Sequence, residues 1–290
     1  MKDERKAAAK LKREQQVKRQ KLILAVVGIF IMITAIIYIS FSCGKEENIE
    51  ASATEVEEVE TIEITVPEKT ETLEERVERV RKEAKEADYP EDVIELLAKN
   101  PETVDFVENY GEQKDRKPAS EIAEFVDGKI PQILQWDARW GYSPYGTGIV
   151  AVCGCGPTCL SMVVSGLTGD ETLTPDKIAE YGTNHGYITE QNDTRWVFMY
   201  EAAKEWGINS REKMLSEEEV KKELKMGHPI ICSVGPGDFT KIGHFIVLAR
   251  CEDGKIIVHD PFSQKNSDKR WDFQEFEDQI KSMWIYSVDE

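Results

Sequence analysis

The chain has 290 residues, 40% of them hydrophobic and 32% charged, which suffices for one sizeable domain with appendages or for two small domains. Its formal net charge of −18, from 37 basic and 55 acidic residues, argues against a nucleic-acid-binding protein, because such proteins present a basic face to phosphate. Six cysteines are too few for a disulfide-dense scaffold, and a mean hydropathy of −0.46 excludes a polytopic membrane protein.

The N-terminal part of the sequence predicts a membrane anchor. Residues 1–21 form a basic tail with nine basic and three acidic residues, and the twenty residues that follow, LILAVVGIFIMITAIIYISF, carry no charge. A helix of that length spans roughly 30 Å, the thickness of the hydrocarbon core of a bilayer. We expect a signal anchor over residues 22–42, with the tail in the cytoplasm and everything after Cys43 outside. A cleaved signal peptide is the alternative, although its apolar run is usually shorter.

Two further segments separate the predicted anchor from the main domain. Residues 43–71 are acidic and low in aromatic residues, which is typical of a solvated stalk. Residues 72–117 predict a helical neck. A capping box at Thr72 starts its first helix, Pro90 opens a second, and Asn100 caps a third.

The remaining residues, 118–290, predict a domain of mixed helices and strands. Helices are expected over 157–167, from 175 onward, over 194–206, and after a cap at Ser216; strands are expected over 229–234, 244–250, 255–259 and 283–288. Because helices come first and antiparallel strands follow, the expected fold class is α+β with segregated halves. The phosphate-binding loop of nucleotide hydrolases is absent, so we expect no nucleotide.

Three cysteines, Cys153, Cys155 and Cys159, cluster at the start of the first helix of this domain. Pro157 suits the first turn of a helix, which places Cys155 at the N-terminus, where free N–H groups and the helix dipole favour a thiolate. Cys159 lies one turn further along, on the apolar face, and is expected in the core, whereas the role of Cys153 stays open. The spacing matches no common zinc pattern, so no metal is expected; a disulfide among the outer cysteines stays open.

Four histidines could act as a base toward such a thiol: His185, His228, His244 and His259. The first two lie in polar loops. His244 begins an apolar strand, where a polar residue faces a cleft more often than a core. An ordinary histidine at a strand edge, with no catalytic role, fits the sequence equally well. A hairpin turn near residue 253 brings Asp260 alongside His244, where its carboxylate could hold the ring. On an alternating strand, His259 should point to the opposite face.

Four sequence blocks, taken in order, resemble a known family: IPQILQWDARWG, YGTGIVAVCGCGPTCLSMVVSGLTG, GHFIVLAR and VHDPFS. They are similar to the bacterial papain-like peptidases related to double-glycine leader peptidases, cysteine peptidase family thirty-nine and its relatives, over about residues 130–288. The resemblance implies a papain-like fold with Cys155 as nucleophile, His244 as base and then acid, and Asp260 as the group that orients His244. It further implies that Gln135 and the backbone N–H of Cys155 form the oxyanion hole.

The resemblance, joined to the predicted anchor, implies a membrane-anchored extracellular cysteine peptidase. Its partners would be a peptide or protein substrate and, through residues 22–42, the lipid bilayer; no cofactor, metal or nucleic acid is expected. The double-glycine substrate does not carry over, because true leader peptidases work on the cytoplasmic side, joined to a transporter. A non-catalytic surface binding module on a peptidase fold is one alternative, and a cell-wall peptide hydrolase or peptidyl transferase is another. Gln132 is the second candidate for the oxyanion glutamine.

Overall fold

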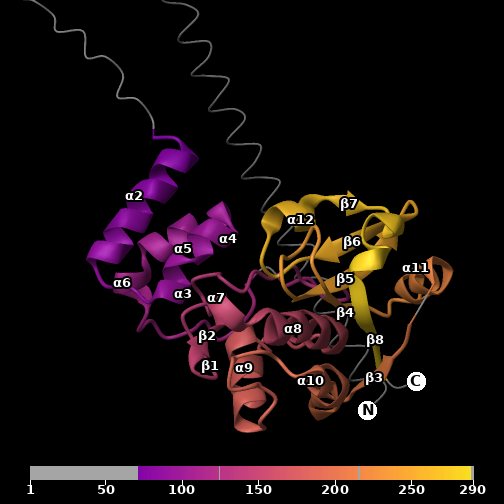
Figure 1. The fold of residues 1–290 in the computed structure, drawn as a ribbon. Coiled ribbons are helices and arrows are strands. Elements are labelled where there is room, and N and C mark those ends of the chain that lie inside the picture. The colour runs from indigo at the N-terminus through magenta and orange to yellow at the C-terminus, as the bar shows by residue number, and fades with distance from the viewer. Residues whose placement is uncertain (1–70, 124, 215, 289–290) are drawn as a thin grey trace, which may run out of the picture. The chain divides into compact units, whose positions relative to one another are not determined.

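The computed structural model describes residues 71–123, 125–214 and 216–288 of the chain (Figure 1). The predicted basic tail, the predicted anchor over 22–42 and all but the last residue of the predicted stalk lie outside the described residues. Within the described ranges, no helix is both long enough and apolar enough to cross a membrane.

The neck is a cluster of short helices behind one longer helix. Its elements are α2 (Leu73–Glu86), α3 (Glu91–Ile94), α4 (Leu96–Lys99), the 3-10 turn η1 (Pro101–Thr103), α5 (Val104–Glu108) and α6 (Tyr110–Gln113). The capping box at Thr72 is present, since its hydroxyl accepts the Glu75 N–H and the Glu75 carboxylate accepts the Thr72 N–H. Asn100 also caps as expected, because its side-chain oxygen accepts the Glu102 N–H.

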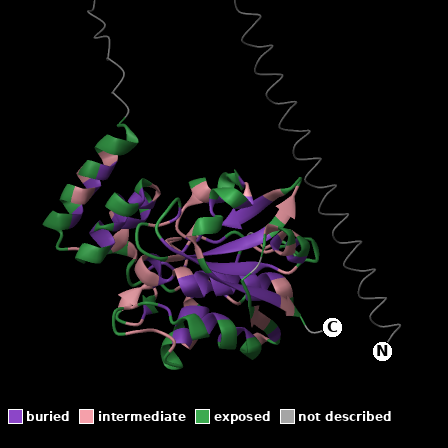
Figure 2. Cartoon of the chain, turned by 45° about the vertical axis from the view of Figure 1, so that its right-hand side comes forward, coloured by how far each residue is buried: buried purple, intermediate pink, exposed green. Residues whose placement is uncertain are grey.

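The neck packs against the main domain through apolar and aromatic side chains. Buried residues of α2 through α5 form one cluster with Tyr142 and Ala151 of the domain. The rings of Phe106 and Tyr142 stack with centroids 4.1 Å apart, and the Tyr142 hydroxyl donates to the Phe106 carbonyl at 3.0 Å. Burying these faces ties residues 72–117 to the domain, and Figure 2 shows the buried face of the helices turned inward.

The helical half of the domain is centred on α8, which is buried along almost its whole length. Its elements are the short strands β1 (Pro144–Tyr145) and β2 (Gly148–Ile149), then α7 (Val150–Cys153), α8 (Cys155–Thr168), α9 (Pro175–Asn184), α10 (Trp196–Glu201) and the 3-10 turn η2 (Ala202–Trp206). Helix α8 begins two residues earlier than the sequence predicts, because a proline in the first helical turn removes no intrahelical hydrogen bond. It ends at Thr168 and is followed by Gly169, whose left-handed φ of 76° terminates the helix.

The second half is a six-stranded sheet in the order β3-β8-β4-β5-β6-β7, antiparallel throughout. Its elements are β3 (Ile208–Glu212), α11 (Glu217–Lys225), β4 (Ile230–Val234), β5 (His244–Glu252), β6 (Lys255–His259), α12 (Gln264–Asp268), β7 (Arg270–Trp271), the 3-10 turns η3 (Phe273–Glu275) and η4 (Glu277–Gln279), and β8 (Ile280–Val288). The α+β class expected from the sequence is therefore confirmed. Strands β1, β2, β3 and β7 were not predicted.

The sheet has a hydrophobic core on each face. In β5, Phe245 and Val247 join the core shared with α8, α9 and α10, whereas Ile246 and Leu248 join the core on the side of α11. This alternation follows from the two-residue period of a strand. The hairpin joining β5 to β6 turns at Asp253 and Gly254, both with positive φ, and its register pairs Val247 with His259.

Candidate active site

Cys155 is the first residue of α8 and is partly buried. Gly154 occupies the N-cap position and supplies no side chain to the free N–H groups of the first turn. These N–H groups and the positive end of the helix dipole favour a negative charge on the sulfur. The location that the sequence predicts for Cys155, at a helix N-terminus, is thus the one observed.

His244, the first residue of β5, lies between Cys155 and Asp260. Its ring Nε2 is 2.8 Å from Asp260 Oδ1, and the Cys155 side chain is close enough to the ring to raise its pKa. Since Nε2 is engaged by the carboxylate, Nδ1 is the nitrogen left for the sulfur. Only 8% of the histidine side chain and 1% of the aspartate side chain are exposed, so both groups interact away from bulk water.

The charge state of His244 follows from these neighbours. Burial alone would lower the pKa of His244, because a buried imidazolium loses its hydration. The Asp260 carboxylate, by charge and by hydrogen bond, and more weakly the Cys155 side chain, outweigh burial and raise the pKa to about 10. At neutral pH the ring therefore carries a proton, which is the state that a neighbouring thiolate requires.

Asp260 is itself held by several donors. Oδ1 accepts the Phe262 N–H at 2.9 Å in addition to the His244 ring, and Oδ2 accepts the Asn266 side-chain amide at 2.8 Å. The Asp260 N–H donates to the Ser267 hydroxyl at 2.9 Å. Sequence reasoning missed Asn266 and Ser267. The available signal was Ser263, whose hydroxyl accepts the Asn266 N–H and thereby starts α12 beside Asp260.

Gln135 lies in the interior beside the segment that leads to Cys155. Its Nε2 donates to the Ala151 carbonyl at 2.8 Å, and its backbone N–H donates to the Pro261 carbonyl at 2.7 Å. The side chain is 2% exposed, and its Oε1 has no hydrogen-bond partner among the described residues. Gln135 therefore contacts both α7, which precedes Cys155, and the loop after Asp260, but its hydrogen bonds do not reach Cys155.

The neighbouring thiols have different surroundings. The Cys153 thiol donates to the Ile149 carbonyl at 3.3 Å, and burial raises its pKa to about 12. Cys159 is fully buried in the core, as the sequence predicts, and burial raises its pKa well above the ordinary value. Both sulfurs are therefore protonated at neutral pH, and neither is a nucleophile in this state.

The other three histidines have structural partners. Nδ1 of His185 lies 2.8 Å from the Tyr181 carbonyl, and Nδ1 of His228 lies 2.7 Å from the Glu223 carboxylate. His259 is buried with Nδ1 3.1 Å from the Pro131 carbonyl, and burial lowers its pKa to about 4. Among the histidines of the described ranges, His244 alone joins a carboxylate and a cysteine.

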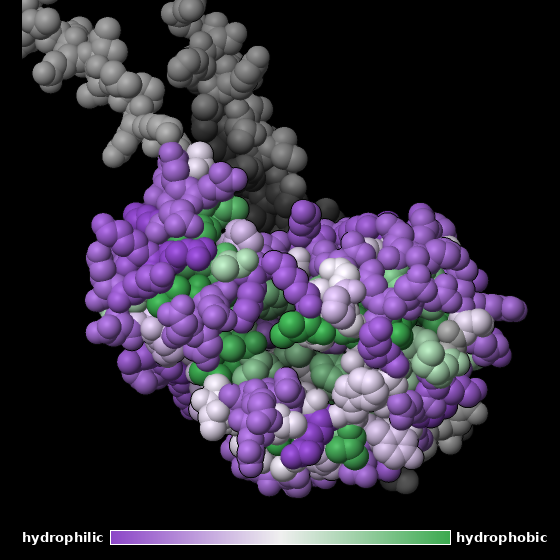
Figure 3. All heavy atoms as spheres, viewed as in Figure 1, coloured by the Kyte–Doolittle hydropathy of each residue, from purple (hydrophilic) through white to green (hydrophobic). Residues whose placement is uncertain are grey.

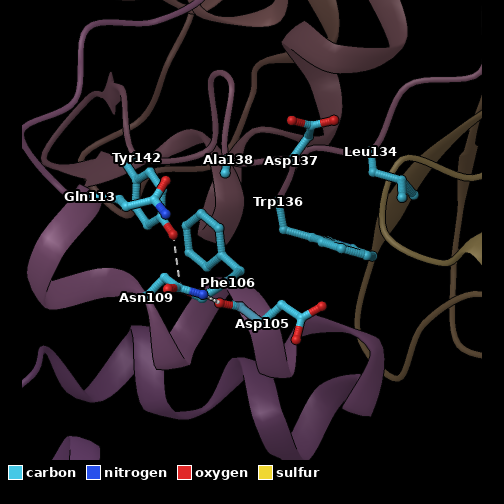
Figure 4. Close-up of a pocket in the computed structure, with 9 residues that line it drawn as sticks. All are labelled: Asp105, Phe106, Asn109, Gln113, Leu134, Trp136, Asp137, Ala138 and Tyr142. Carbon is cyan, nitrogen blue, oxygen red and sulfur yellow. Dashed lines mark hydrogen bonds between the residues drawn. The ribbon is translucent and has the colours of Figure 1, made fainter.

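A hollow of about 210 Å³ lies between the neck and the segment around Gln135 (Figure 4). Its walls come from α5 and α6 on one side and from residues 134–142 on the other: Asp105, Phe106, Asn109, Gln113, Leu134, Trp136, Asp137, Ala138 and Tyr142. The Trp136 indole N–H donates to the Phe262 carbonyl at 2.8 Å, which links this hollow to the loop that carries Asp260. Figure 3 shows a band of hydrophobic residues across this face, over α7 and the start of α8.

Comparisons with known proteins agree with the sequence blocks. The model of a family described as the Peptidase_C39 like family matches residues 128–289, more than half of the chain. The resemblance inferred from the sequence blocks is therefore confirmed. No curated protein gave a significant match.

Three solved structures are similar to parts of this chain. The peptidase domain of Streptococcus ComA, described as a bi-functional ABC transporter involved in a quorum sensing pathway, is 18% identical, with 47% of this chain and 93% of that chain covered and a TM-score of 0.36. A C39-like peptidase from Bacillus anthracis is also 18% identical, with 56% and 96% covered and a TM-score of 0.39. A double glycine motif protease from an AMS/PCAT transporter, in complex with the leader peptide, is 15% identical, with 59% and 99% covered and a TM-score of 0.34.

Proposed function

Because this chain belongs to the Peptidase_C39 like family, we propose that it is a cysteine peptidase that uses Cys155, His244 and Asp260. The observation that carries the proposal is the buried His244 ring, which hydrogen-bonds with the Asp260 carboxylate and interacts electrostatically with the Cys155 side chain. A thiol at a helix N-terminus, a protonated imidazole and a buried carboxylate are the three parts that nucleophilic thiol catalysis requires.

The reaction proceeds through a covalent acyl-enzyme. The Cys155 thiolate attacks the carbonyl carbon of the scissile peptide bond, and the electron pair of the C=O bond moves onto oxygen. When the C–N bond breaks, His244 gives its proton to the leaving amine, and the acyl group remains on sulfur as a thioester. Neutral His244 then takes a proton from water, whose oxygen attacks the thioester. The acid product leaves, and the thiolate–imidazolium pair is restored.

The backbone N–H of Cys155 and the side chain of Gln135 stabilise the oxyanion in this proposal. The first is a helix N-terminal donor. The Gln135 amide donates to the Ala151 carbonyl at 2.8 Å and to the Val150 carbonyl at 3.5 Å, so the role requires one of its two N–H groups to turn from these carbonyls to the oxyanion. Asp260 keeps the ring of His244 oriented and stabilises its positive charge.

A peptide-cleavage assay tests the catalytic part. The full-length protein in detergent is incubated with a peptide library, alongside Cys155→Ala and the matched control Cys153→Ala. Loss of Cys155 should reduce turnover by roughly 10⁴-fold or more, because the members of such a triad act as a unit. Cys153→Ala should keep activity within a few fold. Binding of peptides without cleavage by the wild type would identify a binding module instead, and equal cleavage by Cys155→Ala would refute the assignment.

We further propose that residues 22–42 anchor the peptidase in the cell membrane with its catalytic domain outside the cell. The support is the uncharged run of twenty residues behind a basic tail. Protease treatment of intact cells should remove the domain. Protection of the domain in cells whose surface controls are digested would refute the orientation.

A further inference from the structure

We propose that the neck positions a catalytic residue: Asn100 and Glu102 hold the loop that carries Asp260 in place against His244. We call residues 260–266 the acid loop. The inference rests on the proposed peptidase function, but it concerns a segment outside the family match, since the neck ends at residue 117 and the match begins at residue 128.

The neck binds the acid loop through polar contacts at its centre. Asn100 is buried, and its Nδ2 donates to the Phe262 carbonyl at 2.6 Å. The Glu102 carboxylate accepts two consecutive backbone N–H groups, that of Gln264 at 2.9 Å on Oε2 and that of Lys265 at 3.0 Å on Oε1. A carboxylate at the first turn of α12 stabilises that turn by hydrogen bond and by charge.

The two neck residues also fix each other. Asn100 Nδ2 donates to Glu102 Oε2 at 3.0 Å, and Asn100 Oδ1 accepts the Glu102 N–H at 3.0 Å. The pair therefore presents one donor and one carboxylate in a fixed geometry, so that binding the acid loop costs little side-chain entropy.

The contacts continue from the acid loop to the histidine. Phe262, whose carbonyl Asn100 holds, gives its own N–H to Asp260 Oδ1. Asn266 follows the two residues held by Glu102 and gives its side-chain amide to Asp260 Oδ2. Both oxygens of the carboxylate are thus aimed by residues that the neck restrains. Loosening the neck contacts should lengthen the bond between Asp260 and the His244 ring.

Such loosening changes the pKa at which His244 loses its proton. The groups whose effect on the ring is recorded are Asp260, after β6, and Cys155, at the start of α8. Asp260 favours the protonated ring, whereas burial opposes it. A displaced carboxylate therefore lowers the pH at which His244 loses its proton, whereas a simple loss of stability lowers the amount of folded protein and leaves that pH unchanged.

The test uses the full-length protein in detergent with single-atom changes. Asn100→Asp keeps the cap of the 3-10 turn but replaces the donor to Phe262 with an oxygen. Glu102→Gln keeps the size and one acceptor oxygen but sets an NH₂ group against a backbone N–H. The matched control is Glu108→Gln, because Glu108 is a neck glutamate that pairs with Arg76 and Arg79 and has no recorded contact with the acid loop.

The readout is the rate at which iodoacetate alkylates Cys155, mapped by mass spectrometry from pH 5 to 10.5. A neighbouring imidazolium attracts this anionic reagent, so the alkaline fall of the rate reports the loss of the His244 proton. We expect this fall to move at least about 1 pH unit lower in Asn100→Asp and Glu102→Gln, and to stay in place in Glu108→Gln. Melting curves are recorded to establish that each variant is folded. Because Glu102 is only half-buried, we expect its amide variant to keep the core intact.

Two results would overturn the inference. One is an unchanged alkaline fall in folded Glu102→Gln, which would make the contacts merely structural. The other is an equal displacement in Glu108→Gln, which would assign the effect to the neck's general stability. Alkylation requires no peptide hydrolysis, so failure to cleave any peptide would refute the proposed function without deciding this test.

Discussion

Replacing Asp260 with asparagine should remove the pH dependence that His244 gives to the stability of the fold. The amide retains an oxygen that can accept from the His244 ring and from the Phe262 N–H. It carries no charge, however, and its NH₂ group faces the Asn266 amide that donates to Asp260 Oδ2 in the wild type. The substitution therefore preserves the shape of the site while removing the charge that keeps the ring protonated.

The magnitude follows from the pKa of His244. The rise from the ordinary value of 6.5 to about 10 corresponds to on the order of 4–5 kcal/mol of stabilisation, at about 1.36 kcal/mol per pH unit. Because Cys155 supplies part of this rise, the figure is an upper limit for Asp260. Since the folded pKa lies above the unfolded one, this stabilisation is complete below pH 6.5 and is lost as the pH rises toward 10. In Asp260→Asn, burial keeps the ring neutral throughout that window, and no such slope remains.

Denaturant unfolding of the full-length chain measures this difference in a Cys155→Ala background, because a thiolate at Cys155 has given up one proton and would cancel the proton that His244 gains. All six tryptophans lie between residues 136 and 284, so their fluorescence reports on the domain that contains the site. The stability of Cys155→Ala minus that of the double variant Cys155→Ala/Asp260→Asn should shrink by a few kcal/mol between pH 6.5 and pH 10. Buried acidic groups with raised pKa values, such as Tyr145 and Cys232, destabilise both proteins equally at alkaline pH and cancel in the difference. A difference that stays constant over this range would refute the assignment of the extra proton to His244.

Three further outcomes follow from the surroundings of single residues. With limiting iodoacetamide at neutral pH, Cys155 should be labelled before Cys153, whose burial raises its pKa to about 12; mass mapping that finds Cys153 labelled first would move the nucleophile. Gln135→Ala should lower kcat by about 10²–10³ with little change in KM, and steady-state kinetics showing the reverse would exclude oxyanion stabilisation. His259→Ala should keep its turnover per active site, with active sites counted by thiol titration, because His259 contacts the Pro131 carbonyl and not the site. If His259→Ala lost turnover while His244→Ala kept it, the roles of the two histidines would be reversed.

The parts of the site that the sequence predicted are those set by local geometry. A proline suits the first turn of a helix, and Pro157 therefore indicates that Cys155 lies at the N-terminus of α8. A two-residue turn sets the register at the start of the β5–β6 hairpin, and an irregularity between Leu248 and Arg250 then shifts it by one residue. The resulting pairing brings Asp260 within 2.8 Å of His244. The first result depends on a few consecutive residues, whereas the second also depends on a shift within the hairpin that no short pattern indicates.

Other features depend on packing that no short pattern encodes. Strand β3 reads Ile208-Asn-Ser-Arg-Glu, with no alternation of apolar and polar residues, and it exists because it pairs with β8 at the edge of the sheet. The predicted helix over 194–206 divides into α10 and a 3-10 turn, which ends where Gly207 adopts a φ of 71°. The sequence also gives no indication that the Gln135 amide would meet the Ala151 carbonyl.

The neck was predicted as helices from its caps and apolar spacing, yet its connection to the site could not be read from those patterns. Asn100 had one expected partner, the helix it caps, and this bond is formed through its side-chain oxygen. The cap predicts no partner for its side-chain nitrogen, which in the fold donates to the Phe262 carbonyl, 162 residues away. A capping residue thus uses one half of its amide for local structure and the other half for tertiary contact. Because Glu102, two residues later, holds the same loop, a segment outside the family match restrains the carboxylate on which the charge of His244 depends.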